Sequence, residues 1–311
     1  MLVCNIEESQ VRTQSAIGDV RAYVEFEEDP ATALAVTLAD LGVSSGRVGI
    51  ESHRLPASAL RTLTERLPGI EWIGVDGALE KLQVVKTDDE VDTLATLARS
   101  LLGALDGTVA TLGSSAGEID YAGELVARIA RSGALPLFLV FSSGERTVLG
   151  HPEAERKPLE PGVVWRTDFG ARLPGGLAGD VARTGTVGAP SAEQQEVFAV
   201  LRAAQDAAVA LAEPGRPAHE LFRATKRTFE KNRLAFVMPH VGHGIGVGLH
   251  EAPILEPRND SPLAIGTVLN IEPFAVLSDR REGYHTEDLV LVTASGPRRL
   301  TDPQSDLLVI G

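Results

Sequence analysis

Residues 162–188, GVVWRTDFGARLPGGLAGDVARTGTVG, decide how the C-terminal part of this chain is expected to fold. Two apolar runs flank the turn Pro174-Gly175-Gly176, a pattern typical of two antiparallel strands joined as a hairpin. Each strand carries one acid: Asp168, which follows Gly162 by six residues, and Asp180, which follows the turn. The stretch therefore predicts a hairpin that presents a pair of carboxylates.

Residues 266–293, GTVLNIEPFAVLSDRREGYHTEDLVLVT, repeat this arrangement. Glu272 follows Gly266 by six residues, and Glu287 precedes a second apolar strand. One such match is weak, because acidic strand–turn–strand units are common. The shared glycine offset together with the paired acids indicates an internal duplication, with four carboxylates converging near a pseudo-twofold axis.

A histidine joins these acids in residues 241–251, VGHGIGVGLHE. Four carboxylates and one imidazole are not buried together unless positive charge compensates them. An oxygen-rich ligand set with one nitrogen favours manganese and is compatible with zinc, cobalt or ferrous iron. Five ligands exceed what one catalytic ion usually takes, which favours two ions bridged by shared carboxylates. The sequence thus predicts a two-metal hydrolase.

The motifs DFGARLPGGLAGDVARTGTVG, VGHGIGVGLHEAP, GTVLNIEPFA and GYHTEDLVLVT resemble those of the creatinase/prolidase/methionine-aminopeptidase superfamily, the pita-bread M24 metallopeptidases. The resemblance runs from about Lys86 to the C-terminus, with the motifs in the family's order. It implies an α+β fold built from duplicated helix–helix–hairpin units around a curved antiparallel sheet. It also implies five metal ligands: Asp168, Asp180, His243, Glu272 and Glu287.

The same resemblance indicates catalytic residues. It makes His250 the histidine that contacts the substrate carbonyl or moves a proton, and it places His151 in the substrate pocket. Glu272 is our candidate for the base that takes the proton of water. One departure concerns the substrate: Xaa-Pro peptidases of the family generally have arginine two residues before the last glutamate, where this chain has His285.

The other histidines are expected to have supporting or surface positions. We expect His240 and His285 to orient metal ligands from behind, as histidines next to metal centres often do. We expect His53 and His219 to lie on solvated surfaces.

Domain organisation changes near residue 86. Residues 1–85 alternate strand and helix, with helices expected from Pro30 and from Pro56, and predict a small α/β domain. From the comparison with creatinase-like N-terminal domains, we expect this domain to lack the opening portion. Residues 86–311 form the predicted catalytic domain, whose helices begin at three capping boxes: Thr87–Glu90, Ser115–Glu118 and Ser191–Gln194.

Composition limits the partners. The net charge of −14 argues against nucleic acid, which needs a basic surface. No apolar run has the length of a membrane span, and the N-terminus lacks the pattern of a secretion signal. Cys4 is the single cysteine, which fits a reducing cytoplasm. We expect a homodimer, because the shortened N-terminal sheet would otherwise leave an edge exposed, and because the family resemblance suggests one.

Three functions are compatible with these sequence features. The first is a Xaa-Pro peptidase similar to prolidase or aminopeptidase P, acting on small peptides. The second keeps the metal ions but hydrolyses a small non-peptide amide or amidine, as creatinase and ectoine hydrolase do. The third is a non-enzymatic binding module, to which the complete set of five ligands gives little support.

Overall fold

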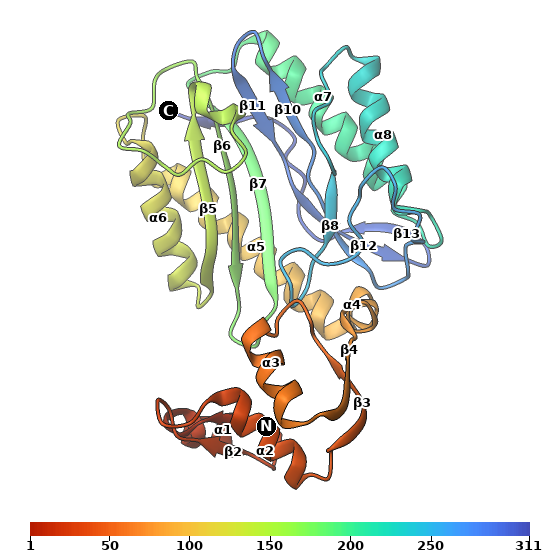
Figure 1. Cartoon of the computed structure of the whole chain (residues 1–311). Coiled ribbons are helices and arrows are strands. Elements are labelled where there is room, and N and C mark those ends of the chain that lie inside the picture. The colour runs from red at the N-terminus through yellow and green to blue at the C-terminus, as the bar shows by residue number, and fades with distance from the viewer. The chain divides into compact units, whose positions relative to one another are not determined.

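The computed structural model describes residues 1–311, which fold into two compact units, Met1–Glu80 and Lys81–Gly311. Figure 1 labels their helices and strands. No helix combines the length and the apolar character that a membrane span requires.

The smaller unit alternates short strands with helices, as predicted. Its elements are β1 (Leu2–Cys4), α1 (Glu8–Gln14), β2 (Arg21–Tyr23), α2 (Pro30–Asp40), β3 (Ser45–Ile50), α3 (Ala57–Arg66) and β4 (Gly69–Gly74), and α4 (Asp76–Val84) follows. The strands form two separate parallel pairs, β1–β2 and β3–β4. Leu63 and Ile70 lie in its small apolar core, which forms where α2 packs on α3.

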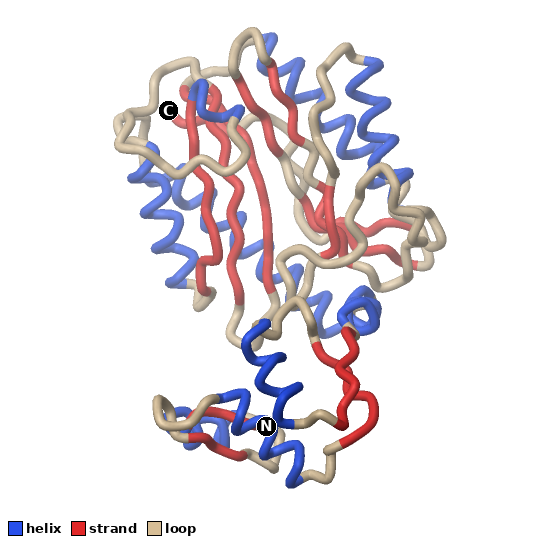
Figure 2. The backbone as a smooth tube through the Cα atoms, in the orientation of Figure 1, coloured by secondary structure: helices blue, strands red, loops and turns tan.

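The larger unit begins with two helices and a hairpin. These are α5 (Asp88–Thr111), α6 (Glu118–Arg131), β5 (Leu135–Ser143), β6 (Val164–Arg172) and β7 (Ala178–Val187). The strands belong to one sheet in the order β14-β7-β6-β5, and Figure 2 shows the helices behind it. Apolar side chains of α5 and α6 form one core with β5–β7, in which Tyr121, Phe141 and Trp165 stack.

A second set of helices and strands repeats this order. It comprises α7 (Ala192–Val209), α8 (Ala218–Lys231), β8 (Gly242–Gly244), β9 (Val268–Ile271), β10 (Phe274–Leu277), β11 (Glu282–His285), β12 (Asp288–Thr293), β13 (Gly296–Arg299) and β14 (Leu308–Ile310). The second hairpin is more elaborate than the first, because β9 pairs with β12 while β10 and β11 form a separate hairpin between them. The sheet order here is β13-β12-β9-β8.

Besides the pairing of β14 with β7, a backbone bridge joins the two hairpins. Ala182 in β7 faces Glu287, whose N–H donates to the Ala182 carbonyl at 3.1 Å. Next to it, Arg183 pairs with the fully buried Asp288 at 2.8 Å. The duplicated helix–helix–hairpin arrangement is therefore present, and its two hairpins are joined at the positions of the acids.

Two of the three predicted capping boxes are formed. Thr87 and Ser191 cap α5 and α7, with Glu90 and Gln194 accepting from their backbone N–H groups at 2.8 and 2.9 Å. The box expected at Ser115–Glu118 is wrong, because α6 begins later, with Asp120 accepting from the N–H of Gly117. Glu118 is instead fully buried, and its carboxylate accepts hydrogen bonds from Ser143.

Candidate metal centre

The first hairpin places two carboxylates on one face. Asp168 faces Ala182 across the ladder, and Asp180 faces Gly170. Since Asp180 and Ala182 are two residues apart on β7, both acids point to the same side of the sheet as diagonal neighbours. The turn between the strands uses positive φ angles at Gly175 (108°) and Gly176 (106°), which glycine adopts readily.

The second half brings in the other three residues. His243 in β8 faces Asn270 in β9, and Glu272 directly follows β9. Glu287 precedes β12 and reaches the first hairpin through its bridge to Ala182. Residues far apart in the sequence thus meet where the two sheets join.

Distances show that the five side chains form one cluster. His243 Nε2 lies 3.4 Å from Glu272 Oε1 and 4.0 Å from Glu287 Oε1. Ligand atoms of His243, Glu272 and Glu287 lie within 4.8 Å of one another, and so do those of Asp168, Asp180 and Glu287. Because Glu287 belongs to both groups, it occupies the position of a carboxylate shared by two ions.

The donor atoms fit a metal. Four buried atoms in the cluster have no hydrogen-bond partner: Asp180 Oδ1, His243 Nε2, Glu272 Oε1 and Glu287 Oε2. Buried polar atoms are normally paired, so this group needs a cation. The His243 Nδ1 lies 2.9 Å from the Gly244 carbonyl, which can only accept. The proton is therefore on Nδ1, and the Nε2 lone pair faces the carboxylates.

The pKa shifts of the five side chains also fit a metal site. Burial raises the pKa of Asp168, Asp180, Glu272 and Glu287, and neighbouring carboxylates raise those of Asp180 and Glu287 further. Burial lowers the pKa of His243 to about 3, so this imidazole is neutral. The neutral imidazole can bind a divalent ion, and such an ion would relieve the repulsion that raises the carboxyl pKa values.

Asn270 supports the cluster, although the sequence patterns did not predict it as a site residue. Its Nδ2 donates to Glu287 Oε1 at 2.7 Å and fixes the orientation of that carboxylate. One sequence feature could have identified it: Asn270 is an amide in an otherwise apolar strand, two residues before Glu272 and therefore on the same face of the strand.

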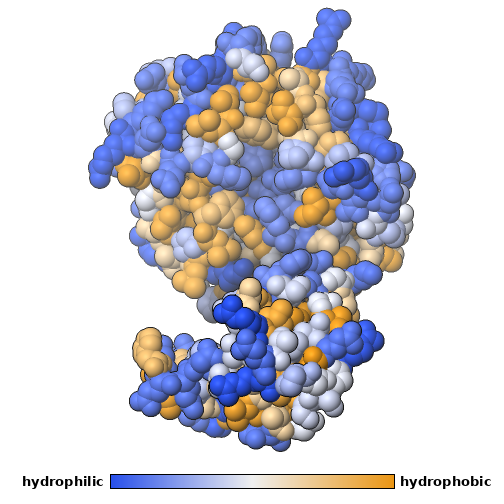
Figure 3. All heavy atoms as spheres, in the orientation of Figure 1, coloured by the Kyte–Doolittle hydropathy of each residue, from blue (hydrophilic) through white to orange (hydrophobic).

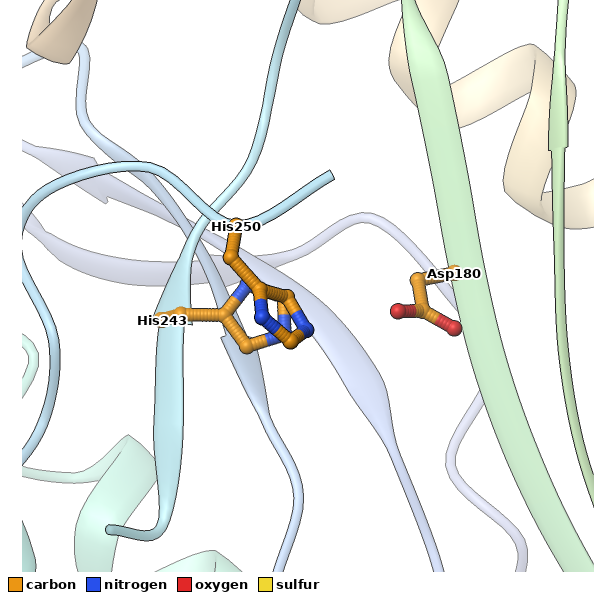
Figure 4. A group of neighbouring side chains, drawn as sticks. All are labelled: Asp180, His243 and His250. Atoms are coloured by element: carbon orange, nitrogen blue, oxygen red, sulfur yellow. The ribbon is translucent and has the colours of Figure 1, made fainter. Parts of the chain in front are cut away.

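His250 lies beside the cluster. Its ring centroid is 4.1 Å from that of His243, and Figure 4 shows both rings on the side facing Asp180. His250, His243 and Asp180 form a third group whose ligand atoms lie within 4.8 Å of one another. Unlike His243, the His250 side chain is exposed. This position allows contact with a bound molecule.

A cavity of about 660 Å³ opens onto the cluster. It is lined by Asp168, Asp180 and Glu272, by His250 and by His151. Figure 3 shows a hollow on this face, with hydrophilic residues inside and apolar residues at its border. The apolar lining includes Leu137, Phe138 and Phe274, which suits a substrate with an apolar ring.

Two further histidines contact the ligands. His285 lies 3.7 Å from Asp168 and 3.6 Å from Glu272, and burial lowers its pKa to about 4. His240 lies 3.5 Å from Glu272. Both imidazoles lie next to ligand carboxylates. His53 is exposed as predicted, whereas the surface position predicted for His219 is wrong: this residue is buried, with Nδ1 2.8 Å from Asp260.

A buried ion pair holds the segment that carries His250. Lys86 Nζ lies 2.7 Å from Glu251 Oε2, and the other carboxylate oxygen accepts from the N–H of Gly248. Both side chains are nearly inaccessible, 3% and 7% exposed. The pair ties residues 248–251 to the chain before α5.

Models of known protein families match most of the chain. The model of "Metallopeptidase family M24" matches residues 96–294, and that of "Creatinase/Prolidase N-terminal domain" matches residues 1–85. The chain is 29% identical over 264 residues to a Xaa-Pro dipeptidase of Pyrococcus furiosus, covering 84% of this chain and 75% of that protein.

Solved structures are similar over nearly the whole chain. An X-Pro aminopeptidase from Thermotoga maritima gives a TM-score of 0.89 at 26% identity, covering 99% of this chain and 87% of the other. A Xaa-Pro dipeptidase from Bacillus anthracis gives 0.89 at 27% identity, covering 99% and 85%. The predicted pita-bread fold is confirmed by these likenesses.

Proposed function

Since this chain belongs to metallopeptidase family M24, we propose that it is a Xaa-Pro peptidase that cleaves small peptides before proline. The observation that carries the proposal is the cluster of unpaired ligand atoms that faces a cavity with an apolar wall. The relatives named as Xaa-Pro dipeptidases and an X-Pro aminopeptidase support the substrate class.

The metal ligands in this proposal are Asp168, Asp180, His243, Glu272 and Glu287. Two divalent ions held there would activate a water molecule and polarise the scissile carbonyl. The oxygen-rich ligand set favours manganese, with zinc, cobalt or ferrous iron as alternatives.

Side chains of this protein would carry the proton transfers. Glu272 is 15% exposed, whereas Glu287 is 1% exposed, so Glu272 is the carboxylate that can take a proton from the cavity. His250, exposed beside His243, is placed to contact the substrate carbonyl or to give a proton to the leaving nitrogen. His151 also lines the cavity and would hold the substrate.

The test combines metal analysis with a substrate panel. Purified protein should contain up to two divalent ions per chain and, when reconstituted with manganese, hydrolyse Xaa-Pro dipeptides. Creatine and ectoine serve as substrates of the non-peptide alternative, which the relatives do not favour. Turnover of creatine or ectoine without peptide cleavage would refute the proposal, and absence of bound metal would support a binding module.

Assembly and location are part of the proposal. We expect a homodimer, so light scattering at micromolar concentration should give about twice the 32.9 kDa mass of one chain. The two-stranded sheets of the smaller unit have open edges that a partner could cover. The lone Cys4 suits the reducing cytoplasm, which fractionation of the native cells would check.

A further inference from the structure

Arg166 is a buried cation next to the metal centre. It lies on β6 two residues before Asp168, on the same face of the strand and therefore roughly 6.5 Å along it. Only 1% of its surface is exposed. The guanidinium of an arginine stays protonated in proteins, so Arg166 is a fixed positive charge.

No carboxylate pairs with this guanidinium. The other buried arginine, Arg183, pairs with Asp288, and the partly buried Arg146 pairs with Glu118. Arg166 donates only to backbone carbonyls, from Nε to Thr147 at 2.8 Å and from Nη2 to Leu149 and Gly150. Since an uncompensated buried charge is costly, a position of this kind is suited to an anion that arrives with a ligand.

The contacts of Arg166 fix the direction of its remaining donor. The guanidinium carbon lies 4.9 Å from the centroid of the Phe274 ring, which sets the plane of the group. Nε and Nη2 are engaged by the segment that leads to His151, while Nη1 makes no hydrogen bond. Because Arg166 lines the same cavity as His151 and Phe274, Nη1 is the donor available to a bound molecule.

Charge balance indicates which molecule this is. Two divalent ions would neutralise the four carboxylates of the metal centre. Arg166 forms no ion pair with any of them, because its hydrogen bonds all go to backbone carbonyls. A dipeptide brings a carboxylate within one residue of its scissile bond, and the planar guanidinium is well suited to bind a carboxylate.

We propose that Arg166 binds the free C-terminal carboxylate of a dipeptide substrate. This inference rests on the proposed Xaa-Pro peptidase function and narrows it. The named relatives include both dipeptidases and an aminopeptidase. Arg166 makes this protein a dipeptidase, which discriminates against peptides whose proline carboxylate is blocked.

The experiment compares L-alanyl-L-proline with its C-terminal amide, which has the same shape and no negative charge. The manganese-loaded protein should prefer the acid by about 10- to 100-fold in kcat/KM, the range of a charge-assisted hydrogen bond. In R166M this preference should fall to near one through a higher KM for the acid, with the amide unaffected. R166K keeps the charge and should retain part of the preference.

A matched control and a binding measurement separate the outcomes. Arg172 also lines the cavity, but its Nη1 already donates to the carbonyls of Gly176 and Val247. R172M should leave the preference unchanged, and if R172M abolishes it instead, Arg172 is the binding residue and the proposal is wrong. Calorimetry on metal-free protein should show that L-proline binds more tightly than prolinamide, and that R166M removes this difference.

Three results would overturn the inference. The first is an unchanged preference in R166M or, if that variant does not fold, in R166K. The second is an equal loss of kcat on both substrates, which would assign Arg166 to positioning the His151 segment only. The third is equal binding of L-proline and prolinamide to the wild type. Cleavage of neither peptide would refute the peptidase function, and the calorimetric comparison would still test the carboxylate site.

Discussion

Glu287→Gln should stabilise the metal-free protein while destroying its response to metal. Glu287 is 1% exposed, and its ligand atom lies within 4.8 Å of those of Asp168 and Asp180. Two like charges at that separation repel by roughly 3.5 kcal/mol at an effective dielectric constant of about 20. Partial protonation in the metal-free state reduces this repulsion, which leaves a net gain of about 1–3 kcal/mol for the neutral amide.

The measurement is the thermal unfolding of chelator-treated protein at pH 8. A gain of this size corresponds to an increase of roughly 3–8 °C in the midpoint for a unit of this length. The amide oxygen of the introduced glutamine can still accept the hydrogen bond from Asn270, so packing should be kept. Manganese should raise the midpoint of the wild type and leave that of Glu287→Gln unchanged, with metal content measured in parallel.

The neighbouring residue provides a matched control. Asp288 is also fully buried, but it faces cations, with Arg183 at 2.8 Å and Arg299 at 3.3 Å. Breaking a buried ion pair costs about 3–5 kcal/mol, so Asp288→Asn should lower the midpoint. It should leave the manganese response in place. If Glu287→Gln lowers the metal-free midpoint as Asp288→Asn does, or still responds to manganese, the reasoning about the carboxylate cluster is incorrect.

Three further outcomes are expected. The carboxyls of Asp180 and Glu287 have raised pKa values in the folded protein, so their contribution to stability is present while they are protonated and is lost as pH rises. The lowered pKa values of His243 and His285 affect stability only below the ordinary histidine pKa of about 6.5. The unfolding midpoint of the metal-free protein should therefore fall as pH rises above about 6.5, and a rise there would contradict this. His250→Ala should keep bound metal and lose roughly a hundredfold in kcat, whereas His243→Ala should lose metal and activity together; metal loss from His250→Ala, or its full turnover, would exclude the proposed role. Lys86→Met leaves the buried Glu251 carboxylate unpaired, so it should lower the unfolding midpoint by several degrees, and the double variant Lys86→Met/Glu251→Gln should recover part of that loss.

Local sequence patterns predicted most of the catalytic unit. The spacing of Asp168 from Gly162, repeated by Glu272 after Gly266, was sufficient to predict two acidic hairpins, because strand alternation and turn residues act over a few positions. The capping boxes at Thr87 and Ser191 were predicted for the same reason. The five candidate ligands could be listed from sequence because so many acids near one histidine cannot be buried without a cation.

Only the tertiary structure decided how distant residues meet. Glu118 has the sequence of a capping residue, but its carboxylate accepts from Ser143 and Arg146 in a buried network, which no local pattern could reveal. His219 is buried, with its Nδ1 2.8 Å from Asp260, a residue distant in the sequence. Asn270 is placed by its hydrogen bond to Glu287, which precedes strand β12. Arg166 is placed by its hydrogen bond to the carbonyl of Thr147, in the segment before His151. Such contacts join residues far apart in the sequence. Their energies depend on how deeply the side chains are buried, and burial is defined only once the chain has folded.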